Sequence, residues 1–313
     1  MDMVYIFFAA IITISITNVV PFAVSGELFK FLEKWASKGT ENGQFNVPHS
    51  MAFDKFGNSY ITDTDNNRVQ KFSSDGKFIK KWGIRGSGDG EFRGPEGIDV
   101  DSSGNIYVAD TGNSRVQIFS SDGRFLKEWG SEGRGDGEFS GHAHGIVIDS
   151  SDNVYVTDRF NHNVQKFSAD GKFITKWGSK GSADGQFNEP HSSAIDVSGN
   201  LYVSDMNNYR IQKFSADGKF ITKWGSKGYN DGQFIRPLGI DIGSDNRVYV
   251  VDQRTSSVQV FSSDGVFIPP RLISQVSSKD NSTILEDIEL DKLNNIYLTD
   301  RGNNIIQKYA IMK

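Results

Sequence analysis

The chain has 313 residues, of which 37% are apolar, 12% aromatic and 23% charged, and it contains no cysteine. This composition excludes a disulfide scaffold, a thiolate metal site, a cysteine nucleophile and a disordered chain. With 34 Lys and Arg against 39 Asp and Glu, the net charge is −5. That sign disfavours a protein that follows a phosphate backbone over a broad surface.

The N-terminal segment, residues 1–25, differs from the rest of the chain. Residues 4–24 carry no charge and are mostly apolar, and residues 23–25 have the small-x-small form that signal peptidase cuts. The segment therefore predicts an export signal followed by a domain of residues 26–313 that lies outside the cytoplasm. It lacks a basic start and is long enough to span a bilayer, so an uncleaved membrane anchor stays the alternative.

The remainder of the chain repeats one pattern six times. A short strand with a central Tyr ends in an aspartate at intervals of 47 or 48 residues, at Asp63, Asp110, Asp158, Asp205, Asp252 and Asp300. Each unit also contains a short apolar strand before it, a strand with a central Gln after it, and a last strand that follows an Asp-Gly turn. Units of this length with four strands indicate an all-β fold, a propeller of six blades that are each a four-stranded antiparallel sheet.

The two ends of the array predict how the ring closes. The last unit stops at Lys313 after three strands, whereas residues 28–35 match the outermost strands of the other units without the three strands that precede them. We therefore expect the N-terminal strand to complete blade six. Such closure supplies a partner to a sheet edge that an open array would leave free.

Residues that recur in every unit are expected to serve the fold. The tryptophans should pack between neighbouring blades: Trp35, Trp82, Trp129, Trp177 and Trp224. The recurrent aspartates should bind Arg68, Arg115 and Arg210 and the glutamines at Gln70 and its equivalents. A function that is served once would not be repeated in all six units.

The fullest unit, Pro95 to Gly123, resembles the NHL repeat, and the resemblance covers about residues 28–313. It implies a six-bladed propeller. Its implication for function is broad, because the family includes extracellular sensor and adhesion domains, RNA-binding modules and peptidyl-hydroxyglycine amidating lyases.

Candidate site residues gather where the inner strands begin, on the face that carries the long connections between blades. The first ring consists of the second residue of each inner strand: His49, Glu96, His144, His191, Leu238 and Glu286. The second ring follows the recurrent aspartates: Thr64, Thr111, Arg159, Met206, Gln253 and Arg301. Three of the five histidines fall in the first ring, and convergent imidazoles or carboxylates suit a divalent metal. A polar, water-filled channel without metal is the alternative.

The resemblance to the amidating lyases implies a zinc ion held by three histidines and an Arg that acts on the substrate. His49, His144 and His191 have matching sequence contexts, and Arg301 resembles the family's Arg, with Arg159 as the other candidate. Two features depart from that pattern: Leu238 stands where the third alternate ligand would be, and Thr111 where a Tyr is expected. A different alternate set, Glu96, His191 and Glu286, could also hold a metal.

These observations predict an exported, monomeric, non-catalytic binding, scaffold or sensor module. Its long-loop face would bind a peptide, protein or glycan, and it would contact a membrane only through an uncleaved N-terminal segment. The alternative is a metal-dependent lyase or hydrolase with zinc as its cofactor. A second alternative, an RNA-binding module, is disfavoured by export and by the acidic charge balance.

Overall fold

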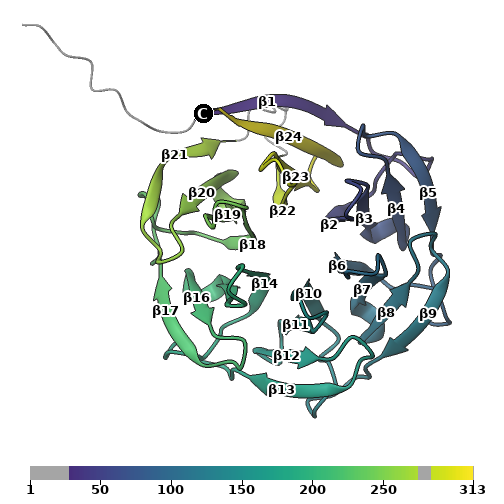
Figure 1. The fold of residues 1–313 in the computed structure, drawn as a ribbon, viewed down its shortest axis with the longest axis horizontal. Coiled ribbons are helices and arrows are strands. Elements are labelled where there is room, and N and C mark those ends of the chain that lie inside the picture. Colours follow the sequence, from purple (N-terminus) through teal and green to yellow (C-terminus); the bar gives the residue numbers. More distant parts are fainter. Residues whose placement is uncertain (1–27, 274–282, 313) are drawn as a thin grey trace, which may run out of the picture.

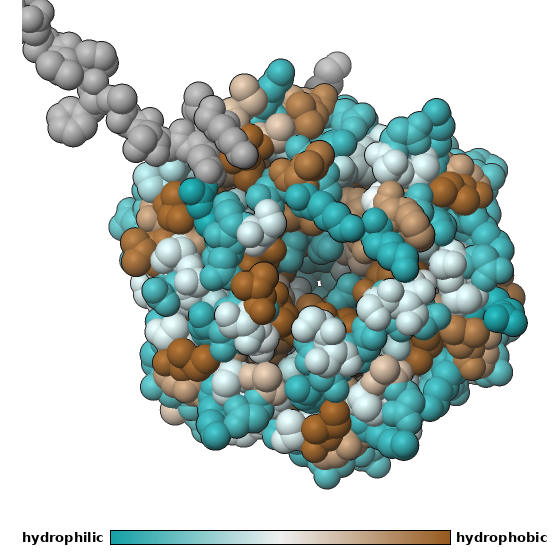
Figure 2. All heavy atoms as spheres, in the orientation of Figure 1, coloured by the Kyte–Doolittle hydropathy of each residue, from teal (hydrophilic) through white to brown (hydrophobic). Residues whose placement is uncertain are grey.

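The computed structural model describes residues 28–273 and 283–312, so the expected leader, residues 1–25, lies outside the described residues. Six four-stranded antiparallel sheets form a closed ring (Figure 1). The predicted six-bladed propeller is confirmed. Figure 2 shows that the ring surrounds a central opening. In the parts of the chain that the structure describes, no helix has the length and apolarity of a membrane span.

Five blades take their strands from consecutive sequence, from the innermost strand to the outermost. Blade one consists of β2 (Pro48–Phe53), β3 (Ser59–Asp63), β4 (Arg68–Phe72) and β5 (Phe78–Trp82). Blade two consists of β6 (Pro95–Val100), β7 (Ile106–Asp110), β8 (Arg115–Phe119) and β9 (Phe125–Trp129). Blade three consists of β10 (Ala143–Ile148), β11 (Val154–Asp158), β12 (Asn163–Phe167) and β13 (Phe173–Trp177). Blade four consists of β14 (Pro190–Ile195), β15 (Leu201–Asp205), β16 (Arg210–Phe214) and β17 (Phe220–Trp224). Blade five consists of β18 (Pro237–Ile242), β19 (Val248–Asp252), β20 (Ser257–Phe261) and β21 (Phe267–Ile273). Four blades carry a short 3₁₀ turn after the second strand: η1 (Thr64–Asn66), η2 (Thr111–Asn113), η3 (Met206–Asn208) and η4 (Gln253–Thr255).

Blade six is completed by the N-terminal strand, as predicted. Its order is β22 (Leu285–Leu290), β23 (Ile296–Asp300), β24 (Ile305–Met312) and β1 (Leu28–Trp35). β1 runs antiparallel to β24, with Leu28 opposite Met312 and Trp35 opposite Ile306, and Figure 1 shows β1 along the outer rim of the ring. The pairing satisfies both edges of β24, as a closed propeller requires.

The blades pack on one another through aromatic rings. The centroid of Trp82 at the end of blade one lies 6.2 Å from that of Tyr60 in its own blade and 5.9 Å from that of Phe119 in blade two. Gly123 of blade two closes over the same indole, and a Cβ atom there would lie 2.7 Å from the ring. Equivalent contacts surround Trp129, Trp177 and Trp224. The predicted packing role of the tryptophans is confirmed.

The recurrent polar residues form one network per blade. The fully buried carboxylate of Asp110 accepts hydrogen bonds from Arg115 Nε at 2.7 Å, Gln117 Nε2 at 3.0 Å and the backbone N–H of Arg93 at 2.7 Å. The expected aspartate–arginine ties are present for Arg68, Arg115 and Arg210. These bonds join the second and third strands to the long loop that precedes the blade.

Candidate functional site

The site begins with an irregularity shared by all six inner strands. Each pairs with its neighbour through a register shift close to its first residue, for example between Pro48 and Met51 in β2. A β-bulge re-aims the side chains beside it. The second residue of each inner strand, the first ring of the sequence analysis, lies within this irregular stretch.

Three first-ring histidines converge although they come from blades one, three and four. The ligating nitrogens of His49, His144 and His191 all lie within 4.8 Å of one another, and the ring centroids of His144 and His191 are 3.9 Å apart. Each residue is exposed by 5% or less. Since adjacent buried imidazoles repel one another when charged, the cluster favours neutral rings at His144 and His191, and the neutral ring is the form that binds a metal.

Glu286 of blade six joins this cluster from across the channel. Its Oε1 atom lies 3.4 Å from His49 Nε2 and 3.3 Å from His191 Nε2. Burial opposes ionisation of this carboxyl, but the hydrogen bonds and charges of both histidines outweigh burial and hold its pKa well below the usual range. The sequence analysis placed Glu286 in the ring and in an alternate ligand set, but not beside His49.

The histidines divide into two electrostatic classes. Burial lowers the pKa of His191 to about 4, and burial with the charges of its two neighbours holds the pKa of His144 well below its usual value. Burial also disfavours the charged form of His49, but its hydrogen bond to Glu286 and the charge of Glu96 raise its pKa. His49 is therefore the imidazole of the cluster that most readily carries a proton.

Two contacts of Glu286 have the spacing of ligands on one zinc ion, whereas the donor nitrogens of the three histidines lie up to 4.8 Å apart. The distances from His49 and His191 to Glu286 exceed the roughly 2.8 Å of a charge-assisted hydrogen bond and match the edge of a tetrahedron, about 3.3 Å for metal–ligand bonds of about 2.0 Å. His144 would be the fourth ligand. The hydrogen bonds around these ligands fit a metal site less well. A metal-bound histidine usually donates a hydrogen bond from its second nitrogen, but within the described residues the Nδ1 atoms of His49 and His191 have no hydrogen-bond partner.

Gln253 and the two arginines of the second ring contact carboxylates. Gln253 Nε2 donates to Glu286 Oε2 at 2.8 Å, and Arg301 Nη1 lies 3.1 Å from the same oxygen. Arg159 instead forms an ion pair of 2.6 Å with Glu189. Of the two arginines expected to orient a substrate, only Arg301 therefore contacts the histidine–glutamate cluster.

The remaining second-ring residues join neighbouring blades. Thr64 Oγ1 donates to the carbonyl oxygen of Pro95 at 2.7 Å, and Thr111 Oγ1 to that of Ala143 at 2.7 Å. Met206 is buried. The two threonines stabilise the start of the next inner strand, and Met206 offers little free surface to a ligand.

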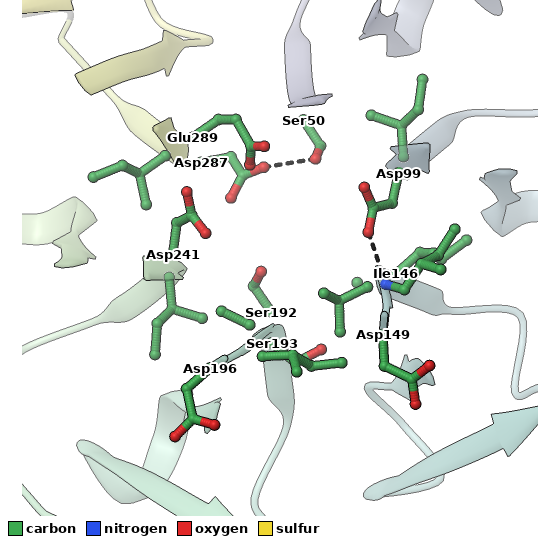
Figure 3. Close-up of a pocket in the computed structure, with 18 of the residues that line it drawn as sticks. Ser50, Asp99, Ile146, Asp149, Ser192, Ser193, Asp196, Asp241, Asp287 and Glu289 are labelled. Carbon is green, nitrogen blue, oxygen red and sulfur yellow. Dashed lines mark hydrogen bonds between the residues drawn. The ribbon is translucent and has the colours of Figure 1, made fainter. Parts of the chain in front are cut away.

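A second charged layer, which the sequence analysis missed, lies farther along the channel. Asp99, Asp241 and Glu289 occupy the fifth position of β6, β18 and β22, and Asp287 the third position of β22. They line a cavity of about 300 Å³, and Figure 3 shows their carboxyl groups arranged around its open centre. In the other blades the fifth position of the inner strand holds Ala or Val. The acidic residue at this position in three blades is therefore the sequence feature that could have predicted the layer.

Burial raises the pKa of each of these carboxyls, so that protonated and ionised groups coexist in the layer near neutral pH. It raises the pKa of Asp99 and of Asp241 to about 7 and that of Asp287 to about 6. For Glu289, burial and the charges of Asp241 and Asp99 raise the pKa well above its usual value. The layer is therefore a set of carboxyl groups whose charge changes in the physiological pH range.

Comparison with known families identifies the repeated unit. The NHL repeat matches residues 92–119 and 234–261, and a family described as a 6-bladed beta-propeller matches residues 146–222. The chain is a six-bladed propeller that carries NHL repeats. The matched segments of this NHL-repeat propeller fall in blades two to five, and the predicted resemblance is confirmed. No curated protein matches its sequence.

Solved structures share the fold of the NHL-repeat propeller at low sequence identity. A protein of unknown function from Bacteroides thetaiotaomicron has a TM-score of 0.71 and 18% identity, over 91% of this chain and 76% of that one. Virginiamycin B lyase from Staphylococcus aureus has a TM-score of 0.63 and 14% identity, over 91% and 100%. A gluconolactonase from Xanthomonas campestris has a TM-score of 0.64 and 15% identity, over 86% and 88%. At these identities the likeness concerns the fold alone.

Proposed function

We propose that this protein is an exported, non-catalytic binding module whose long-loop face holds a peptide, protein or glycan. Export rests on the sequence of residues 1–25. Binding rests on how the long loops are built: they are fixed to the blades by the same hydrogen bonds, while the side chains at their tips differ. A preformed surface with varied side chains loses little conformational entropy when it binds a partner.

The loop before blade two illustrates how the backbone is fixed. Arg115 Nη2 donates to the carbonyl oxygens of Gly88 at 2.8 Å and Glu91 at 2.9 Å. Gln117 accepts from the N–H of Gly90 at 2.9 Å and donates to the carbonyl oxygen of Glu91 at 2.7 Å. A short bridge closes the loop between Arg85 and Phe92, and it recurs in four other long loops. The described loops are therefore rigid without depending on their tip residues.

The tips differ strongly at equivalent positions. The position two residues after the first bridged residue holds Thr40, Ser87, Arg134, Ser182 and Tyr229. Tyr229 is 71% exposed. Since the long loops present varied side chains on a fixed backbone, their face is the one expected to select a partner.

A photo-crosslinking experiment tests the proposal. A photoreactive phenylalanine analogue at Tyr229 on the long-loop face should capture a partner in the native environment. The matched control is the same analogue at Phe56, which is 75% exposed in a turn between β2 and β3 on the opposite face. Capture only from position 56, or from neither position, would contradict the proposal.

The histidine–glutamate cluster favours a second candidate, a zinc-dependent lyase or hydrolase of the amidating-lyase type. His49, His144 and His191 with Glu286 would hold the ion, and Arg301 would orient an anionic substrate. With these four ligands a tetrahedral zinc would be closed, so one of them, such as Glu286, would have to give way before the ion could activate a water or polarise a carbonyl group. The fold itself also serves proteins named as lyase and gluconolactonase. The cavity that the imidazoles line has a volume of only about 10 Å³, so a substrate would have to displace side chains, and for this reason we rank binding first.

Elemental analysis of the purified protein separates the two candidates. The zinc site predicts stoichiometric metal that is lost in His49→Ala and in His144→Ala, with folding unchanged by circular dichroism. His162→Ala is the matched control, because His162 lies in a loop of blade three outside the cluster and accepts a hydrogen bond from the N–H of Glu189. Metal that all three variants retain, or the absence of metal from the wild type, would refute this site. Loss in the two cluster variants would justify assays with peptidyl-hydroxyglycine substrates.

A further inference from the structure

Blade three departs from the other blades on the long-loop face. The turn after its second strand reads Arg159-Phe160-Asn161-His162, and no 3₁₀ turn forms there. Phe160 is the only aromatic residue at its repeat position, which elsewhere holds Asp65, Gly112, Asn207, Arg254 and Gly302. Because an aromatic residue occurs at this position in one blade only, the propeller fold does not require it, and the role of Phe160 must lie in blade three itself.

The next departure is Asn163. It begins β12, where the corresponding strands of blades one, two and four begin with an arginine whose guanidinium fills the space under the long loop. Asn163 is only 7% exposed, and within the described part of the chain its Oδ1 atom has no hydrogen-bond partner. A buried acceptor without a donor costs stability unless a ligand or water supplies the donor.

This asparagine lines an open cavity of about 490 Å³ that has a strongly basic wall. Arg134, Lys176 and Lys180 contribute to the wall, and none of the residues that line it is acidic. Lys176 pairs with Asp136 at 2.9 Å. Among the described residues, the side chains of Arg134 and Lys180 form no ion pair or hydrogen bond, so two cations are free to bind an anion.

A smaller cavity of about 230 Å³ adjoins the first, and both are lined by Arg134, Phe160 and Asn161. We call the two cavities together the blade-three groove. Phe160 is 44% exposed between them. Its ring is held by His142, at 4.2 Å between centroids, and by the guanidinium of Arg159 at 5.3 Å. The groove thus presents a fixed apolar surface directly beside a cationic cavity.

We propose that the blade-three groove binds an acidic peptide segment. A carboxylate of the segment enters the cavity of Arg134 and Lys180, an apolar side chain beside it packs on Phe160, and a backbone or side-chain N–H donates to Asn163 Oδ1. This assignment names the partner class for the proposed long-loop function and rests on that function. Recognition of acidic motifs by clustered cations is an established way to bind peptides.

Charge and size favour a peptide over a nucleic acid. The groove offers only two unpaired cations, Arg134 and Lys180, and Glu132 also lines its smaller cavity, in a protein with a net charge of −5. A single strand instead requires a basic path along several phosphates. The two cavities also have the size of a pocket for a small ligand or a few side chains. An oligonucleotide is therefore the competing ligand in the test.

Fluorescence anisotropy with the full chain provides the test. The probe is a labelled peptide of alternating Glu and Leu, and the comparison peptide has Gln in place of every Glu. We expect the acidic peptide alone to bind. Lys180→Ala should weaken its binding about ten-fold, the effect of one lost charge-assisted hydrogen bond. Lys227→Ala is the matched control, because Lys227 occupies the same repeat position in the next long loop, and it should leave affinity unchanged.

Asn163→Arg provides the second variant. The new guanidinium should fill the cavity and reach Asp158 as its equivalents do in other blades, so binding should be lost while the melting temperature stays equal or rises. Equal binding of the Gln peptide, equal effects of the two lysine variants, or full affinity in Asn163→Arg would overturn the proposal. Tighter binding of a single-stranded oligonucleotide would overturn it in favour of a nucleic acid. If the groove fails while position 229 still captures a partner, only the groove is refuted, whereas failure of both refutes the long-loop function as well.

Discussion

Replacing Asp99 with asparagine should stabilise the protein at alkaline pH and destabilise it by about 1 to 2 kcal/mol in acid. Burial raises the pKa of Asp99 from 3.8 to about 7, a difference of about three. Each pKa unit corresponds to about 1.4 kcal/mol, so holding this carboxylate ionised in the folded protein costs up to about 4 kcal/mol. Asparagine removes that cost. Asp99 accepts backbone hydrogen bonds from Val100 and Ile148, each 2.7 Å long. Asparagine can accept only one of them, and the lost bond destabilises the variant by about 1 to 2 kcal/mol.

The sign of the pH dependence follows from proton binding. The folded protein keeps the Asp99 proton up to about pH 7, whereas the unfolded chain releases it near pH 4. Between these values the folded state binds more protons, so the stability of the wild type falls as pH rises through this window. The Asn variant lacks this proton. Its advantage should therefore grow between about pH 4 and pH 7 and reach about 2 kcal/mol above pH 8.

Urea unfolding followed by tryptophan fluorescence at several pH values measures this difference, provided that both proteins have the same denaturant slope. The control is Asp149→Asn, which lies in the same cavity. Burial opposes ionisation of Asp149, but hydrogen bonds from Asn153 and the backbone N–H of Ser151 outweigh burial and lower its pKa, so this variant should gain nothing at high pH. An advantage of Asp99→Asn that is equal at about pH 5 and above pH 8 would refute the assigned burial cost.

Three further changes test the fold. Trp129→Ala should cost about 3–5 kcal/mol, because it removes a ring that packs between blades two and three; a loss below about 1 kcal/mol in urea unfolding would contradict that role. Asp110→Asn removes the charge that compensates the buried Arg115 and should lower the free energy of unfolding by about 3–5 kcal/mol. The control Asp122→Asn, in an exposed turn, should change it by no more than about 0.5 kcal/mol. Equal melting temperatures of the two variants would refute this. Deletion of residues 28–35 leaves β24 with an unpaired edge and should cause self-association, so light scattering that finds only monomer would argue against the closing role of β1.

The fold could be predicted because each blade repeats the same physical solution. Intervals of 47 or 48 residues, a recurrent aspartate in all six units and a tryptophan in five of them are enough to define the four-stranded blade and the contact to its neighbour. The unmatched strand at residues 28–35 determined the closure. These features lie in short stretches of sequence, so they can be recognised without knowledge of the three-dimensional structure.

The site could be predicted only in part, because it depends on distances across the ring. Ring positions follow from the repeat, and they placed His49 and Glu286 on the same layer. Their 3.4 Å separation depends on bulge geometry and side-chain rotamers, which the repeat does not encode. The role of Asn163 was missed for a different reason. Blade three lacks the arginine that fills the space under the long loop in other blades, and only the structure shows that this space stays open.

The position of β1 has a consequence for the order of events during biosynthesis. β1 is the first strand of the ring to leave the ribosome and pairs with the last one, so Leu28 must wait for Met312. Blades one to five can assemble from neighbouring sequence as they emerge, whereas the ring closes only once β24 has been synthesised. Contacts between such distant residues form late because the entropy of a long loop must be lost first. Until then β1 remains an unpaired strand, and a chain that stops before β24 exposes it permanently to proteases and chaperones.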